Sequence, residues 1–94
     1  MHAMLVTVDI DGTRVDESIK VLHEVTIPMV KSRAGFVRGS WLRSADGTSG
    51  RGVIMFDTAD NANTAISTLR DQGPPAGGPV KIKSVDVFEV IAEA

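Results

Sequence analysis

The residues best suited to bind or transform a small molecule are a tryptophan and two arginines that lie close together in the chain. Trp41, the only tryptophan, stands between Arg38 and Arg43. An indole ring can serve as a platform for an aromatic ligand, and a guanidinium can hold a carboxylate or a phenolate, so the three form a candidate ligand-binding site. A purely structural role for the same three residues is favoured, and the ligand-binding role stays open as the alternative. In the structural role, Trp41 anchors contacts between subunits, and the arginines are hydrated or pair with acids on neighbouring strands.

His23 and Asp9 are further candidates, as groups that could transfer a proton. An imidazole beside the apolar residues Ile19 and Leu22 could act as a base or as a ligand near neutral pH. The carboxylate of Asp9 would lose its water if a partner covered that end of the first strand. Spacing alone places no second metal ligand and no orienting carboxylate near His23, so His23 is more simply a histidine on the flank of a helix. Asp9 is more simply a hydrated carboxylate at the end of a strand. We therefore predict no metal site and leave the catalytic set undefined.

Two kinds of periodicity indicate the elements that would position these residues. Alternating apolar side chains predict strands at 4–10, 36–43, 51–56 and 80–91, with a division of the last strand around Lys83 left open. Apolar residues at three- and four-residue steps predict helices at 15–35 and 58–73. The apolar stripe of the first helix consists of Val15, Ile19, Leu22, Thr26, Met29 and Val30. Pro28 lies within this helix, where its ring and its missing N–H should bend or break it. Residues 72–79, rich in glycine and proline, read as a connecting loop.

The order β-α-β-β-α-β predicts an α+β fold of the ferredoxin-like type, in which both helices cover one face of an antiparallel sheet. We assign Leu5, Thr7, Trp41, Val53 and Met55 to the other face, which the helices leave uncovered. Burying each large apolar side chain contributes roughly 1.5–3 kcal/mol. A homodimer that buries on the order of 1,200–2,000 Å² is therefore expected.

Length and composition narrow the remaining possibilities. Ninety-four residues suit one domain, residues 1–94, and the absence of cysteine excludes disulfides and thiolate metal sites and indicates the cytoplasm. The apolar run at 4–8 is too short for a signal peptide or a membrane span. A net charge of −2 with both signs interspersed argues against nucleic acid, and Val53 and Met55 stand where an RNA-recognition domain would need stacking aromatic residues.

Two segments carry a resemblance to a known family. The first is the pair Ile27 and Pro28 followed by residues 34–41, AGFVRGSW, and the second is residues 53–58, VIMFDT, leading into an alanine-containing helix. In these two segments and in its topology, the chain resembles the dimeric α+β barrel proteins related to the antibiotic biosynthesis monooxygenases. The resemblance covers nearly the whole chain. The resemblance implies a homodimer whose two sheets form a shared barrel. It also implies a pocket, within the barrel or beside the helices, for a small and often aromatic molecule.

The resemblance also bears on cofactors and activity. The haem-degrading members use a late histidine as iron ligand, whereas both histidines here, His2 and His23, are early in the chain, so no cofactor is expected. Two functions remain. One is a homodimeric small-ligand-binding or accessory module without demonstrable catalysis, which the absence of a polar cluster favours. The other is a cofactor-independent monooxygenase-like enzyme that acts on a small aromatic or polyketide-like substrate near Trp41 and His23.

Overall fold

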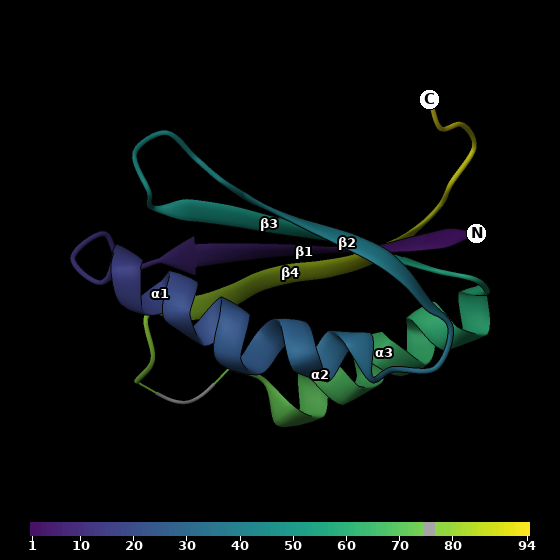
Figure 1. The fold of residues 1–94 in the computed structure, drawn as a ribbon, viewed down its shortest axis with the longest axis horizontal. Helices are drawn as coiled ribbons and strands as arrows, with labels where there is room; N and C mark the ends of the chain where they lie inside the picture. The colour runs from purple at the N-terminus through teal and green to yellow at the C-terminus, as the bar shows by residue number, and fades with distance from the viewer. Residues whose placement is uncertain (75–76) are drawn as a thin grey trace.

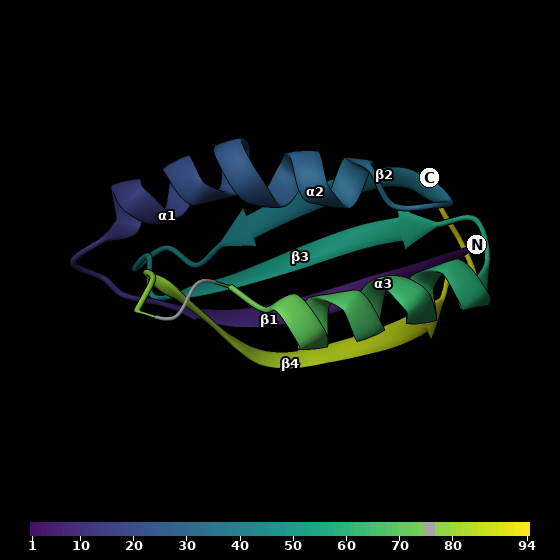
Figure 2. The same cartoon turned by 90° about the horizontal axis from the view of Figure 1, so that it is seen from below.

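A computed structural model describes residues 1–74 and 77–94 and shows one antiparallel sheet with helices on one of its faces (Figures 1 and 2). In these residues the sheet has the strand order β2-β3-β1-β4. The strands are β1 (His2–Ile10), β2 (Phe36–Arg43), β3 (Ser49–Phe56) and β4 (Val80–Glu89), and the helical segments are α1 (Val15–Val21), η1 (Leu22–Thr26), α2 (Ile27–Lys31) and α3 (Ala59–Gln72). The predicted ferredoxin-like α+β fold and its element order are confirmed. The predicted loop at 72–79 includes Pro75 and Ala76, which lie outside the described residues.

Three strands differ in detail from the predicted ones. β3 begins two residues earlier, at Ser49, and β4 ends two residues earlier, at Glu89. The first strand begins two residues earlier, at His2, where it pairs with both β3 and β4. The last strand is not divided, but its register against β1 shifts between Thr7 and Val8, which leaves Lys83 as an extra residue. Such a bulge lets a strand continue while the side chains on either side of it keep facing the core.

The core lies between the sheet and α3. Its buried members on the strands and on α3 are Met4, Val6, Ile54, Phe56, Ala62, Ala65 and Ile66. Phe56 is fully buried and meets Phe36 edge to face, with ring centroids 6.4 Å apart. Thr58 is the N-cap of α3, and its hydroxyl accepts a hydrogen bond from the backbone N–H of Asn61 at 3.1 Å. The small side chains of Ala62 and Ala65 let α3 pack closely on the strands.

At Pro28, where a bend or break was predicted, the helical segment continues (Figure 2). The residues just before the proline form a π turn. In η1 the N–H of Ile27 donates to the carbonyl of Leu22, five residues earlier. In an uninterrupted α-helix, the ring of Pro28 would press against the carbonyl of Glu24 and the bond to that carbonyl would be missing. The wider π turn accommodates the proline, so the helix changes its hydrogen-bond pattern and does not end.

The turn between β2 and β3 is held by one carboxylate. Oδ1 of Asp46 accepts hydrogen bonds from the Thr48 N–H at 3.0 Å, the Ser44 hydroxyl at 2.7 Å and the Thr48 hydroxyl at 2.8 Å. These bonds, led by that of the Thr48 N–H, lower the pKa of Asp46 from 3.8 to about 2. The next residue, Gly47, has a φ of +78°, which a residue with a side chain rarely adopts.

We expect this turn to lose stability in acid. Because the folded pKa of Asp46 lies below its ordinary value, the ionised carboxylate stabilises the fold above pH 3.8, and that contribution is lost as the pH falls toward about 2. Asp46→Asn should flatten the dependence of the melting temperature on pH in this window. Thermal unfolding followed by circular dichroism checks it, with Asp71→Asn, at an exposed position on α3, as the control. A variant profile as steep as that of the wild type would contradict this account of the turn.

Candidate functional site

A cavity of about 540 Å³ lies on the helix-covered face of the sheet. The segment formed by α1, η1 and α2 makes one wall, the C-terminal half of α3 makes the opposite wall, and β1, β2 and β3 make most of the floor. Most of the lining is apolar, with Leu22 and Met29 on one wall, Leu69 on the other and Val8 on the floor. Its volume falls within the roughly 300–1,000 Å³ of small-molecule sites.

The cavity exists because the first helical segment does not pack down onto the strands. Of its six predicted stripe residues, Val30 alone is buried, while Ile19 is 38% exposed. The strands beneath it carry Gly39, Gly50 and Gly52 on the helix-covered face, and these have no side chains to fill the space. From Ile19 onward, the stripe therefore faces the sheet, as predicted, and lines a cavity there.

The prediction that Trp41 lies on the open face is wrong, because its side chain lies on the helix-covered face. It pairs with Gly52, which pairs with the core residue Val6. The pairing of β2 with β3 shifts between Phe36 and Arg38, which leaves one extra residue in β2. A one-residue insertion moves every later side chain of the strand to the other face, and the predicted strand contained no such bulge. Trp41 is half-buried and lines the cavity.

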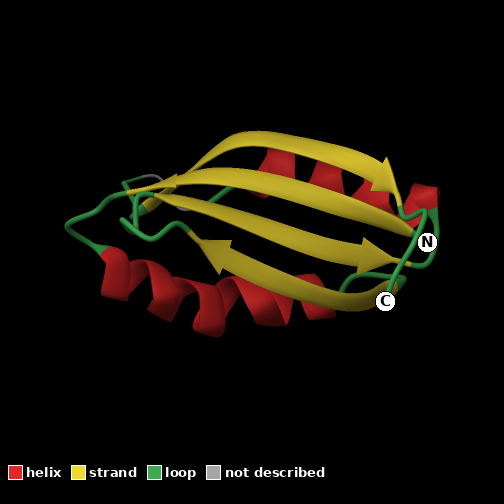
Figure 3. Ribbon diagram, turned by 90° about the horizontal axis from the view of Figure 1, so that it is seen from above, coloured by secondary structure: helices red, strands yellow, loops and turns green. Residues whose placement is uncertain are grey.

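The other residues assigned to the open face lie where they were predicted. Leu5 pairs with Val53, and Thr7 pairs with Arg51, in a register that places them opposite the core-facing set of β1. Met55 pairs with Ala3 in the same row. Within the described residues no helix covers this face, as Figure 3 shows.

The structure separates the two candidate arginines. Arg43 pairs with Gly50 at the end of β2, shares the face of Trp41 and lines the cavity with an exposed side chain. Arg38 lies on the open face and forms an ion pair with Glu93 in the C-terminal segment. The predicted trio is therefore reduced to Trp41 and Arg43.

Sequence reasoning missed Arg33, which lines the cavity beyond the end of α2 and is half-buried. Its place in the chain, between a helix and Gly35, gave no sign that it would border a pocket. No aspartate or glutamate is among the lining residues in the described part of the chain.

The structure brings His23 to the cavity but keeps Asp9 away from it. His23 lies on η1 with an exposed side chain at the edge of the lining. Asp9 is exposed at the end of β1, pairs with Ser49 and Lys81, and lies on the open face, as expected. Among the described residues, no three His, Asp or Glu side chains are grouped to hold a metal ion. No described helix is both long enough and apolar enough to span a membrane.

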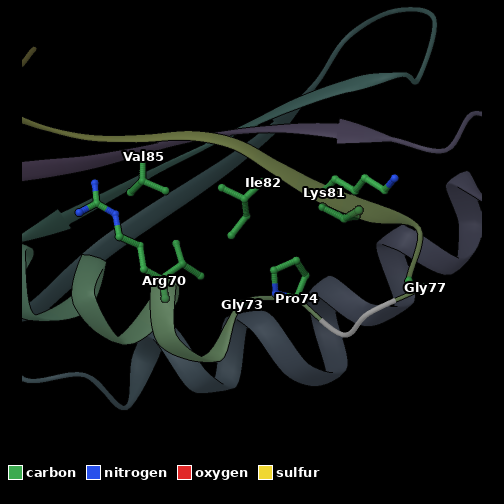
Figure 4. Close-up of a pocket in the computed structure, with 10 residues that line it drawn as sticks. Arg70, Gly73, Pro74, Gly77, Lys81, Ile82 and Val85 are labelled. Carbon is green, nitrogen blue, oxygen red and sulfur yellow. The ribbon is translucent and has the colours of Figure 1, made fainter.

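A second, smaller depression of about 430 Å³ lies between the end of α3 and β4 (Figure 4). Its floor is apolar and includes Ile82 and Val85, and two cationic residues, Arg70 and Lys81, stand at its rim. Both cationic side chains are exposed, and Figure 4 shows them extending in opposite directions, away from the centre. They do not converge on a ligand, so the larger cavity is the better candidate site.

Comparisons with known proteins gave no match to a family model and none to a curated protein sequence. Among solved structures, the chain is similar to the haem degrader MhuD of Mycobacterium tuberculosis, at 17% identity and a TM-score of 0.76, over 100% of this chain and 99% of that one. It is similar to a dimeric ferredoxin-like protein from an uncultured marine organism, at 15% identity and a TM-score of 0.71, over 99% and 97% of the two chains. It is also similar to the ActVA-Orf6 monooxygenase of Streptomyces coelicolor, solved with nanaomycin D, at 16% identity and a TM-score of 0.63, over 99% and 89%.

These likenesses extend over nearly the whole chain, but their sequence identities are low. They establish the arrangement of the backbone and leave the chemistry of the cavity to be argued from its own residues. This chain has the ferredoxin-like α+β fold that its sequence predicted, and the similar structures share that fold.

Proposed function

We propose that this protein is a homodimeric module that binds a small, largely apolar ligand with a carboxylate or phenolate group in the cavity between its helices and sheet. The observation that carries the proposal is the composition of the lining. Trp41 and Arg43 share one face of β2, and the described lining holds no carboxylate, although the chain has 12 acidic and 10 basic residues. An apolar cavity with cations at its rim and no anions favours an anionic ligand.

Three arginines are among the lining residues, and one of them, Arg51, belongs to the open face by its pairing with Thr7. The other two, Arg43 and Arg33, would contact different parts of a ligand. Arg43 stands two residues after Trp41 on the same face of one strand, which separates their Cβ atoms by about 6–7 Å. A ligand ring over Trp41 can therefore carry an acidic group that reaches Arg43. Arg33 lies toward the opposite end of β2, since its carbonyl accepts a hydrogen bond from the N–H of Phe36 at 3.3 Å. We assign the primary anion contact to Arg43.

The homodimer is proposed from the open face of the sheet. Leu42 is 56% exposed and Phe88 54% exposed on this face, with Leu5, Val53 and Met55 between them. The C-terminal segment crosses one end of the same face, where Glu93 pairs with Arg38 (Figure 3). A second copy would cover these apolar side chains, and the dimeric ferredoxin-like neighbour supports such an arrangement.

The binding proposal can be tested with 2-naphthoate, a small aromatic carboxylate, because Trp41 is the only tryptophan and the chain has no tyrosine. We expect saturable quenching of the tryptophan fluorescence as the probe is added. Arg43→Gln should weaken binding about tenfold, the size expected for the loss of a partly hydrated charge-assisted hydrogen bond. Arg38→Gln is the matched control and should leave the affinity unchanged, because Arg38 lies on the other face.

Two results would refute the binding site as proposed. One is the absence of saturable quenching with the wild-type protein. The other is an equal effect of Arg38→Gln and Arg43→Gln, since a general loss of positive charge would then explain the weaker binding. Binding of 2-(aminomethyl)naphthalene, an alkyl amine that is cationic at neutral pH, as tight as that of naphthoate would refute the selection for an anion.

A second candidate function is a cofactor-independent monooxygenase-like enzyme acting on an aromatic or polyketide-like substrate. It is favoured by the meeting of His23 and Trp41 at one cavity and by the monooxygenase neighbour solved with nanaomycin D. An electron-rich substrate that reacts with oxygen itself would need the protein to hold it and to exclude water. Oxygen uptake with dihydroxynaphthalenes tests this function. No uptake, or uptake that His23→Gln and Trp41→Phe leave unchanged, would rule it out.

Haem is bound by one of the similar proteins, so the fit of this lining to haem has to be considered. An iron ligand in the cavity would have to come from His23, the one histidine in the described lining. Its side chain is exposed, and it takes part in none of the side-chain hydrogen bonds of the described residues. An iron-ligating histidine is normally oriented by a hydrogen bond at its second nitrogen. The residues present do not form a haem site, and the proposed function uses none.

A further inference from the structure

The indole of Trp41 lies flat on the backbone of two strands. A Cβ atom added to Gly39 would stand 2.8 Å from Cη2 and 3.0 Å from Cζ3 of Trp41. One added to Gly52 would stand 3.1 Å from its Nε1 and 3.2 Å from its Cδ1. Gly39 therefore lies under the six-membered ring and Gly52 under the five-membered ring. Since a Cβ projects out of the plane of the sheet, contact at both ends of the indole means that the ring runs along the sheet surface.

Glycine is needed at these two positions because a side chain would collide with the indole, and not because of the backbone conformation. Neither Gly39 nor Gly52 is among the glycines with positive φ, so an L-residue could adopt either backbone. Glycine inside a strand weakens the strand and commonly marks the close approach of another group. Here the approaching group is the indole, and a side chain at either position would lift one end of it and turn its edge toward the cavity.

A flat indole offers one ring face to the backbone and the other to the cavity. The lining contains Trp41, Gly52 and Arg43, so the free ring face and the guanidinium border the same space. None of the hydrogen bonds of the described residues involves the indole N–H, which leaves it able to donate to an acceptor on a ligand. Aromatic rings stack best face to face with an offset, and a globular aliphatic group touches far fewer atoms of such a surface.

We propose that Gly39 and Gly52 are specificity-determining residues that hold Trp41 flat and thereby select a planar, fused-ring anion. The inference rests on the proposed function and specifies the shape of its ligand. One ring stacks on the indole, and the acidic group reaches the guanidinium of Arg43, whose Cβ lies about 6–7 Å along β2 from that of Trp41. A bicyclic carboxylate offers both a flat ring system for the first contact and a charge for the second.

The test compares two carboxylates with the same number of carbon atoms and the same charge, planar 2-naphthoate and cage-shaped 1-adamantanecarboxylate, by titration calorimetry. We expect the wild type to bind 2-naphthoate about tenfold more tightly, and Gly39→Ala to reduce that preference to near parity by weakening 2-naphthoate alone. Gly52→Ala crowds the indole less closely and should also reduce the preference for 2-naphthoate. It replaces Gly39→Ala in the test if that variant fails to fold. Gly12→Ala is the matched control, because Gly12 lies outside the cavity lining, does not have a positive φ, and its Cβ would meet Thr48 and not Trp41, so it should leave the preference unchanged.

The possible outcomes separate this inference from the proposed function. Binding of neither carboxylate by the wild type refutes the cavity as an anion site. Equal binding of the two leaves that site in place and overturns the selection for planar rings. A preference for 2-naphthoate that survives in both Gly39→Ala and Gly52→Ala also overturns it, because the glycines would then not be its cause.

Discussion

Val53→Asp should convert the proposed homodimer into folded monomers. Val53 lies in the middle of the open face, paired with Leu5 on β1 and with Ser40 on β2. In a monomer the new carboxylate would face water from the surface of the sheet. In a dimer it would be enclosed among apolar side chains, where an unpaired charge costs several kcal/mol, so the dissociation constant should rise on the order of a thousandfold.

Sedimentation velocity at micromolar concentration measures this effect, and circular dichroism shows that the variant is folded. Asn63→Asp adds the same charge at an exposed position of α3 and should remain dimeric. Met55→Lys, on the same face, should also dissociate the dimer if the loss of a valine from the strand proves harmful in itself. A wild type that sediments as a folded monomer, or a Val53→Asp variant that stays dimeric, would show that the open face is not the interface.

The elements could be predicted because each depends on local pattern. The alternation in β1 and the stripe from Val15 to Val30 appear in the order of residues alone, and the structure has a strand and a helical segment there. Pro28 showed that the helical hydrogen bonding had to change near it, but not how. A break, a bend and a π turn all relieve the same clash, and only contacts with the rest of the fold choose among them.

The alternation of apolar residues could not place Trp41 on the correct face, because β2 has apolar side chains in both of its alternating sets. Phe36 and Trp41 face the helices, whereas Val37 and Leu42 do not belong to the core, and all four are apolar. Without the extra residue near Val37, the same alternation would place Trp41 outside. The register depends on pairing with β3, which is a long-range property.

A signal for the correct face was nevertheless present in the sequence. Gly39, two residues before Trp41, and Gly52, in the strand expected to pair with β2, are glycines within predicted strands, where glycine usually marks a close approach. Together they indicate a large group lying across both strands. Arg33 offered no comparable signal, since only the folded chain shows that the end of α2 borders the cavity.

The structure divides the helix-covered face of the sheet into a packed part and an open part. Under α3, large side chains on β1 and β3 meet small ones on the helix and form the core. Under the first helical segment, glycines face a half-exposed stripe and form the cavity. Substitutions in the first part should therefore act mainly on stability, and substitutions in the second mainly on ligand binding.

Phe56→Ala gives the largest stability effect that this division predicts. Its side chain is 0% exposed, and its removal takes away both its own burial and its edge-to-face contact with Phe36. We expect the free energy of unfolding to fall by about 3–5 kcal/mol, a large part of the roughly 5–15 kcal/mol of a typical domain. Urea unfolding should be measured in the Val53→Asp background, so that the loss in the core is not mixed with changes in dimerisation.

Phe88→Ala in the same background is the matched control for this prediction. Phe88 is also a phenylalanine on a strand, but it is 54% exposed and pairs with Ala3 on the open face. Removing it from a monomer should cost less than about 1 kcal/mol, because little of its surface is withdrawn from water there. Equal losses for the two phenylalanines would mean that the open face is packed as tightly as the core in a single subunit, and the reason for a second copy to cover it would then be gone.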